Sequence, residues 1–169
     1  MAENEKISQA LETMRSGIYI VTSAYRNQPA GCTCVWVSRV SFEPPLIAAV
    51  LAPGRHTLQT IERGKRLCVN VLGESSLELA RKFGFTSGKE SKKFTGVKHH
   101  RGASGSPVLN EAVSYLDCAL QDILDLGDHR LVLGKVVDAA IQRSGQPYVY
   151  APESFYGDET VHHGVIGAE

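Results

Sequence analysis

A stretch rich in basic residues offers the first candidate chemistry in this chain. Glu90 is the only acidic residue between positions 81 and 101, whereas the basic residues there are Arg81, Lys82, Lys89, Lys92, Lys93, Lys98 and Arg101. Glycine and serine residues lie among them, and their backbone amides can approach an anion closely. The stretch can therefore be interpreted as a site for a phosphate group on a small ligand, or as a solvated basic loop.

A second candidate is the segment from Gly31 to Pro45, GCTCVWVSRVSFEPP. It has the apolar pattern of a strand, but it also carries polar side chains at Thr33, Ser38, Arg39 and Ser41. It contains Trp36, the only tryptophan of the chain. Serine and threonine are common in strands, and tryptophan is often a core residue, so this segment alone does not define a site.

The third candidate is His129, which follows a turn formed by Gly127 and Asp128. A hairpin turn accounts for the glycine and the aspartate by itself. His129 is expected at the start of a strand, whereas loops are expected around His99, His100, His162 and His163. An imidazole can orient a substrate or transfer a proton near neutral pH, although a single histidine is more often structural.

The four cysteines are expected to pack in the core. Cys32 and Cys34 form a C-x-C pair, but a zinc site would need a matching second pair, which Cys68 and Cys118 do not form. Four cysteines are also too few for a disulfide framework in a chain of this length. The sequence motifs of serine hydrolases, P-loop proteins and zinc proteases are absent. We therefore expect no metal site.

Composition places the chain among ordinary globular proteins. Of the 169 residues, 43% are hydrophobic and 21% are charged, with 18 basic residues balancing 18 acidic ones. Nucleic-acid binding is not expected, because it depends on an excess of Lys and Arg. The longest apolar run, residues 46–52, is far shorter than the ~20 residues of a membrane helix, and the polar start does not resemble a signal peptide. We expect one domain over residues 1–157, a loose tail over residues 158–169, and a cytoplasmic location.

The apolar pattern predicts a protein built mainly from strands. Strands are expected over residues 18–25, 30–41, 46–51, 67–72, 112–126 and 130–143, with a short one over residues 147–150. Short helices are expected over residues 5–16, 56–63 and 75–83, and residues 84–107 are expected to be irregular. Long strands joined by tight turns, without regular β–α alternation, favour an antiparallel barrel over a doubly wound sheet.

Taken in order, short motifs resemble the flavin reductase-like family, the FMN-binding split β-barrels. The matching segments are SGIYIVT (16–22), residues 31–45, NVL (70–72), LARKF (79–83), KF (93–94), GSPVLN (105–110), LDC (116–118), GDH (127–129) and GKV (134–136). The version WVSRVSF resembles the branch also found as the flavin reductase module of diiron flavoproteins. The resemblance implies a mainly β fold, a six-stranded antiparallel Greek-key split barrel with a few short helices. It also implies a homodimer with flavin in a groove near the dimer interface.

The resemblance implies flavin contacts from three segments and a role for one histidine. Backbone and hydroxyl contacts to the isoalloxazine ring and ribityl chain are implied for Thr33, Cys34, Val35, Trp36, Ser38 and Ser41. Closure over the ribityl phosphate is implied for a loop and helix start that contain Leu51, Arg55, His56 and Thr57. Further phosphate contacts are implied for Ser91, Lys92 and Phe94. His129 is implied to lie near the flavin ring and the nicotinamide site.

The function implied by the resemblance is that of an NAD(P)H-dependent flavin reductase. A hydride would pass from NADH or NADPH to N5 of FMN, or of FAD, and the electrons would go on to a downstream acceptor such as a monooxygenase. One alternative is a tightly FMN-bound electron-transfer flavoprotein or ferric reductase. The other alternative is a non-enzymatic flavin-binding barrel, because one fold can serve several functions.

Overall fold

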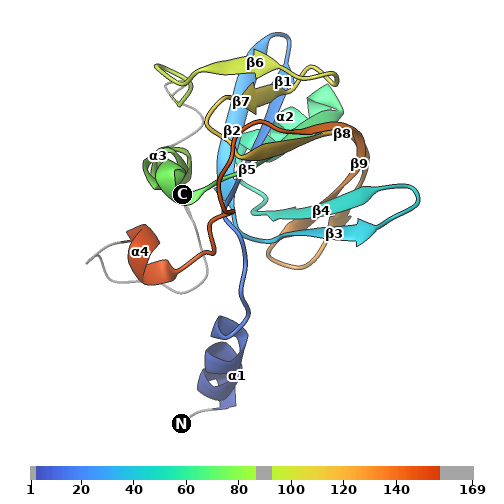
Figure 1. The fold of residues 1–169 in the computed structure, drawn as a ribbon. Helices are drawn as coiled ribbons and strands as arrows, with labels where there is room; N and C mark the ends of the chain where they lie inside the picture. Colours follow the sequence, from blue (N-terminus) through green and yellow to red (C-terminus); the bar gives the residue numbers. More distant parts are fainter. Residues whose placement is uncertain (1–2, 87–92, 157–169) are drawn as a thin grey trace.

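The computed structural model describes residues 3–86 and 93–156, in which strands predominate (Figure 1). The strands are β1 (Tyr19–Tyr25), β2 (Gln28–Cys34), β3 (Val37–Ser41), β4 (Leu46–Leu51), β5 (Arg66–Val71), β6 (His99–Arg101), β7 (Pro107–Leu109), β8 (Ser114–Asp125) and β9 (Arg130–Ile141). The helices are α1 (Glu3–Glu12), α2 (His56–Gly64), the 3₁₀ turn η1 (Glu74–Ser76), α3 (Leu77–Phe85) and α4 (Pro152–Tyr156). None of these helices is both long and apolar enough to cross a membrane.

The described strands form one antiparallel sheet of seven, in the order β2-β1-β5-β8-β9-β4-β3, while β6 and β7 pair separately. The edge strands β2 and β3 are consecutive in the chain and are joined only by Val35 and Trp36. So short a connection makes the sheet curl until its edges approach each other, and Figure 1 shows β8 and β9 bending round in this way. The predicted mainly β, antiparallel architecture is confirmed. The implied count of six strands is wrong, and the described strands do not close into a hydrogen-bonded ring.

The strand predicted over residues 30–41 is interrupted at Val35 and Trp36. β2 pairs with β1 up to Cys34, whereas β3 pairs with β4 from Val37 onward, so the chain changes its partner strand at this point. Among the described residues, the amides of Val35 and Trp36 donate to no backbone carbonyl. The break therefore leaves two backbone donors unused where the two edges of the sheet meet.

Three short segments also differ from the prediction. Residues 84–107, which were expected to be irregular, contain the strand β6, and it pairs with β7 at the end of that range. Residues 147–150 form isolated bridges rather than a strand, and the first helix ends at Glu12. Elements of three or four residues have too few alternating positions to be recognised from an apolar pattern. The tail predicted over residues 158–169 lies outside the described residues, and the extent of the domain stays a prediction.

Apolar side chains pack into two clusters on the two faces of β1. Val21 belongs to the cluster that also contains Leu58 and Ile61 of α2, whereas Ile20 belongs to the cluster with Phe83 of α3. Successive strand residues point to opposite faces, which explains this division. All four cysteines are buried and free, so their predicted packing role is confirmed. Within the described ranges, no group of three His, Cys, Asp or Glu side chains is placed to hold a metal ion.

The buried thiols lead us to expect a loss of stability at alkaline pH. Burial raises the pKa of Cys34 from 9.0 to about 12 and that of Cys118 from 9.0 to about 12. The unfolded chain ionises these thiols first, so their stabilising effect is complete below pH 9 and is lost as the pH rises to about 12. In that window each thiol lowers the free energy of unfolding by roughly 1.4 kcal/mol per pH unit.

Urea unfolding between about pH 8 and pH 10.5 measures this dependence. The variant Cys118→Ala should lose stability less steeply above pH 9 than the wild-type protein. Equal slopes for the two proteins would contradict the expected role of Cys118.

Candidate functional site

Trp36 and His129 come together from different parts of the chain. Their ring centroids lie 4.9 Å apart, with the ring planes inclined at 59°. The Val50 amide of β4 donates to the Trp36 carbonyl at 2.9 Å, and Val50 pairs with Leu131 of β9 on its other side. Strand β4 thus holds the β2–β3 connection next to the turn that carries His129.

The turn between β8 and β9 fixes the imidazole of His129. Gly127 adopts a φ of 82°, a conformation that favours glycine, and the Leu126 amide donates to the His129 carbonyl at 2.8 Å. The Nδ1 atom of His129 lies 3.0 Å from Oδ1 of Asp128, and this hydrogen bond lowers the pKa of the Asp128 carboxyl. The His129 side chain is only 15% exposed. Because Asp128 occupies Nδ1, the nitrogen left for a ligand is Nε2.

A buried cation, Lys93, lies beside the edge strand β2. Lys93 is 4% exposed, and its ammonium donates to the carbonyls of Gly31 at 3.0 Å and Phe83 at 2.9 Å. Among the described residues it forms no ion pair with a carboxylate. Burial lowers the pKa of this ammonium; nearby Cys32 opposes that shift, and Arg55 adds to it. An uncompensated buried cation is costly, so this position fits an anionic group that would supply the missing charge.

The N-terminus of α2 adds positive potential to the same region. Arg55 at the N-cap provides no side-chain cap, and no acidic residue lies in the first turn, so the partial positive charge of the first amides is not compensated. Burial raises the pKa of the Cys32 thiol, whereas Thr57 and Arg55 lower it, and Arg55 also interacts electrostatically with Lys93. We call this group, made of Arg55, the α2 N-terminus and Lys93, the anion cradle.

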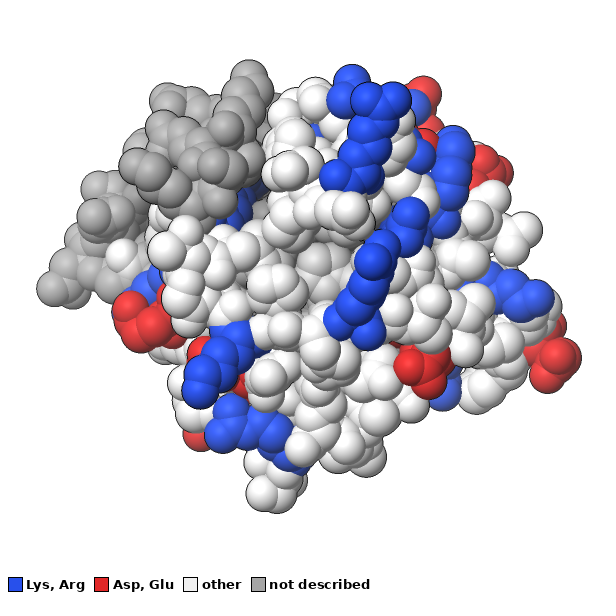
Figure 2. Space-filling model, turned by 90° about the horizontal axis from the view of Figure 1, so that it is seen from above, with Lys and Arg blue, Asp and Glu red and all other residues white. Residues whose placement is uncertain are grey.

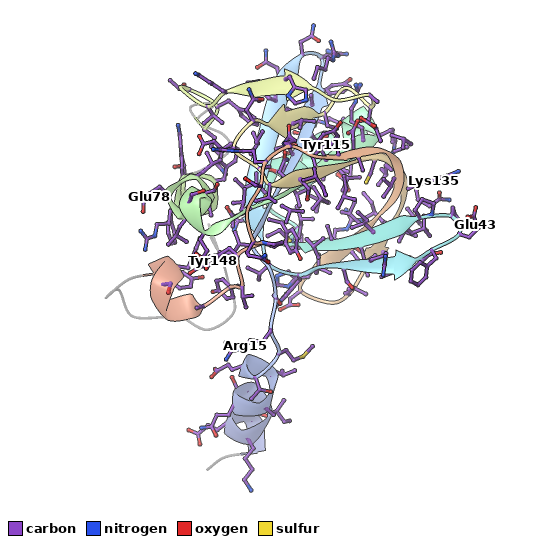
Figure 3. The ribbon with its side chains drawn as sticks, viewed as in Figure 1. Arg15, Glu43, Glu78, Tyr115, Lys135 and Tyr148 are labelled. Carbon is purple, nitrogen blue, oxygen red and sulfur yellow. The ribbon has the colours of Figure 1, made fainter. Side chains whose placement is uncertain are left out.

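The ring pair and the anion cradle are connected by one end of β4. Leu51, the last residue of β4, pairs with Arg130 next to His129, and α2 begins shortly after it at His56. At the opposite end Leu46 pairs with Lys135, and Figure 3 shows Lys135 and Glu43 toward the far end of the β3–β4 hairpin. The arrangement fits an elongated ligand with a planar ring at one end and a phosphate at the other, which is the form of a flavin nucleotide.

The other candidates on β2 and β3 have different surroundings. The Thr33 hydroxyl donates to the Ala80 carbonyl of α3 at 2.5 Å, and the Cys34 thiol donates to a β4 carbonyl at 3.3 Å. Val35 packs against the cluster beneath α3. Ser38 is exposed and Ser41 is half-buried, both on β3. Side chains of β2 are thus already used in packing, and the backbone groups available to a ligand are the amides of residues 35 and 36.

In the basic stretch, the structure describes only part of the predicted phosphate side. Ser91 and Lys92 lie outside the described residues. The Phe94 ring packs edge-on against Phe83 at 5.1 Å, next to the carbonyl that Lys93 contacts. Lys93 itself was not singled out from the sequence, because it differs from its basic neighbours only in being buried. Tyr156 was also missed; it interacts electrostatically with Arg55 from the far end of the described chain.

Other features lie apart from this site. A hollow of about 520 Å³ is lined by Gly64, Lys65, Arg66, Ala103, Ser104, Ala119 and Val137, and it contains none of the predicted site residues. Figure 2 looks down on the upper side of Figure 1 and shows a run of Lys and Arg side chains across that face, with Asp and Glu nearer its rim. Arg101 and Lys98 are exposed, so these members of the basic stretch behave as solvated surface.

Known proteins resemble this chain in sequence and in fold. The high molecular weight rubredoxin of Moorella thermoacetica is 33% identical over 85% of this chain and 64% of its own length. The reductase subunit HsaB of a flavin-dependent monooxygenase from Mycobacterium tuberculosis is 34% identical over 72% of this chain and 63% of its own. This chain therefore spans a little under two thirds of both relatives. The crystal structure of the flavin reductase HpaC with NADP⁺ matches with a TM-score of 0.76 and 26% identity, over 87% of this chain and 92% of that one.

A family model covers most of the chain. The model of the flavin reductase like domain matches residues 11–157, a range that contains Trp36, His129 and the whole anion cradle. The resemblance inferred from the ordered motifs is thereby confirmed. The chain belongs to the flavin reductase-like domain family.

Proposed function

We propose that this chain is an NAD(P)H-dependent flavin reductase that uses FMN, with FAD as the alternative flavin and NADH or NADPH as the donor. The observation that carries the proposal is that the Trp36–His129 pair lies at the end of β4 that leads into α2, and that Arg55 at the N-cap of α2 interacts electrostatically with the buried Lys93. The unused amides of Val35 and Trp36 add two donors beside the ring pair. These groups fit the planar ring and the phosphate of a flavin.

Each of these groups has a distinct task in the proposed reaction. A bound flavin would supply the redox chemistry, taking up at N5 a hydride from the reduced nicotinamide together with a proton from solvent. The amides of Val35 and Trp36, which have no backbone acceptor among the described residues, would donate to the negative charge that a reduced flavin ring carries at its N1–C2 carbonyl side. His129 orients the nicotinamide through Nε2 while Asp128 holds Nδ1, and the anion cradle holds the phosphate.

The proposal extends to assembly, location and electron acceptor. We propose a cytoplasmic homodimer of split barrels, and the exposed apolar side chains at the ends of two hairpins support an interface: Val40, Phe42, Leu124 and Leu126. The Mycobacterium tuberculosis relative is the reductase subunit of a monooxygenase, which supports a monooxygenase as the acceptor of the reduced flavin.

The experiment that tests this function follows nicotinamide absorbance with purified protein and NADH, with and without added FMN, and repeats it with NADPH. We expect oxidation of the nucleotide that rises and saturates with free FMN. Oxidation that does not depend on added FMN would favour a tightly held flavin and an electron-transfer role. No oxidation of either nucleotide, in protein shown to bind FMN, would leave only a flavin-binding barrel.

A further inference from the structure

The indole of Trp36 is held in place but partly exposed, so a planar ligand can stack on it. Trp36 is 46% exposed, although an indole is a large apolar group that usually lies in a core. Part of the ring contacts the imidazole of His129, and the Trp36 carbonyl is held by the Val50 amide. The residue is therefore fixed in place at its backbone and on one side of its ring, and the rest of the indole is open to solvent.

The charges around Trp36 differ from those at the anion cradle. Asp128, 92% exposed, is hydrogen-bonded to the histidine that Trp36 contacts, and its carboxylate is negative at neutral pH. Among aromatic side chains an indole attracts a cation over its face most strongly. The cations Arg55 and Lys93, by contrast, both interact electrostatically with Cys32, at the anion cradle. The ring end of the site thus favours a positively charged planar group, whereas the cradle favours an anion.

We propose that Trp36 is a specificity-determining residue that holds the nicotinamide ring more tightly after oxidation than before it. The reduced ring is neutral, and the loss of a hydride to the flavin leaves a planar aromatic cation. Stacking on the indole, with the Asp128 carboxylate bound to the adjoining His129, stabilises the cation in preference to the neutral ring. The oxidised nucleotide therefore leaves slowly and inhibits the reaction. This inference rests on the proposed reductase function.

Product inhibition tests the proposal in the working enzyme. In Trp36→Leu, the inhibition constant of the oxidised nucleotide should rise about two- to tenfold relative to wild type, with a smaller change in KM for the reduced nucleotide. Trp36→Phe keeps an aromatic face, so its inhibition constant for the oxidised nucleotide should lie between those of the wild-type protein and Trp36→Leu. Tyr25→Leu is the matched control, because Tyr25 is an aromatic residue at the β1–β2 turn that contacts Arg26 rather than His129. Equal changes in both constants, or no change, would overturn the proposal.

Fluorescence of the only tryptophan gives a readout that needs no turnover. The flavin-free protein is titrated with 1-methylnicotinamide, a cation, and with nicotinamide, its neutral counterpart. We expect saturable quenching by the cation and much weaker quenching by the neutral ring. Saturable quenching by FMN together with none by 1-methylnicotinamide would assign the indole to the isoalloxazine ring and overturn the proposal. Absence of nucleotide oxidation in the wild-type assay would instead reject the reductase function itself, so the two failures are distinguishable.

Discussion

Replacement of His129 with alanine is expected to slow flavin reduction about 10- to 100-fold while flavin affinity stays nearly unchanged. The imidazole is held by Asp128 at 3.0 Å and by the ring of Trp36, so it is oriented before a ligand arrives. Loss of this side chain leaves the nicotinamide without a partner at Nε2, and a misplaced ring reaches the distance for hydride transfer less often. The anion cradle consists of residues distant from His129 in the chain, so the substitution leaves the proposed phosphate contacts, and with them most of the flavin affinity, unchanged.

Rapid-mixing measurement of flavin absorbance with saturating NADH gives the rate of reduction, and a flavin titration gives the affinity. His100→Ala is the matched control, because His100 is an exposed histidine on β6 that hydrogen-bonds Asn110. The control should reduce flavin at the wild-type rate. Equal rates for His129→Ala and the wild-type protein would remove His129 from the mechanism.

Replacement of Lys93 with methionine is expected to weaken FMN binding about 10- to 100-fold, because a charge-assisted hydrogen bond to a phosphate is worth more than a neutral one. Methionine has a similar length but no charge, so the compensation that the buried ammonium offers to an anion is lost. Riboflavin, which has the same ring and no phosphate, should bind the variant and the wild-type protein about equally. The comparison of the two flavins separates a phosphate contact from a general effect on the fold.

Calorimetric titration with FMN and with riboflavin measures both affinities. Lys98→Met serves as the control, since Lys98 belongs to the same basic stretch but is exposed. We expect wild-type affinity for both flavins in that variant. If Lys93→Met weakens FMN and riboflavin by the same factor, Lys93 acts on the fold and not on the phosphate.

The elements around the site could largely be predicted from the sequence. The helix expected over residues 56–63 is α2, and the turn at Gly127 and Asp128 joins two long strands as expected. Both depend on local signals, helical spacing and turn residues, which act within a few positions of the chain. His129 and the start of α2 therefore lie where local patterns place them.

The features that depend on distant contacts could not be predicted in this way. The break at Val35 and Trp36 arises because the first half of the extended segment pairs with β1 and the second half with β4. The residues of the segment do not by themselves indicate which strands they will pair with. Lys93 is distinguished from its basic neighbours only by its contacts with Gly31 and Phe83. Gly31 is far from Lys93 in the chain, and Phe83 is brought close to it by the position of α3. Burial of a polar residue is a property of the packed molecule, so the local pattern identifies the basic stretch but not its buried member, Lys93.

The bridge between Gly17 and Val149 brings the beginning and the end of the sheet-forming body side by side. The Tyr150 amide donates to the Ser16 carbonyl at 2.7 Å and the Ile18 amide to the Tyr148 carbonyl at 3.2 Å, so the chain enters and leaves at one point. A unit with this geometry can be joined to other domains, or inserted between them, without its sheet being pulled apart. The match to the Moorella thermoacetica relative covers 64% of that protein, so the relative contains further residues beside the segment that resembles this chain. Adjacent chain ends allow such additional residues to be joined to the unit without disturbing its sheet.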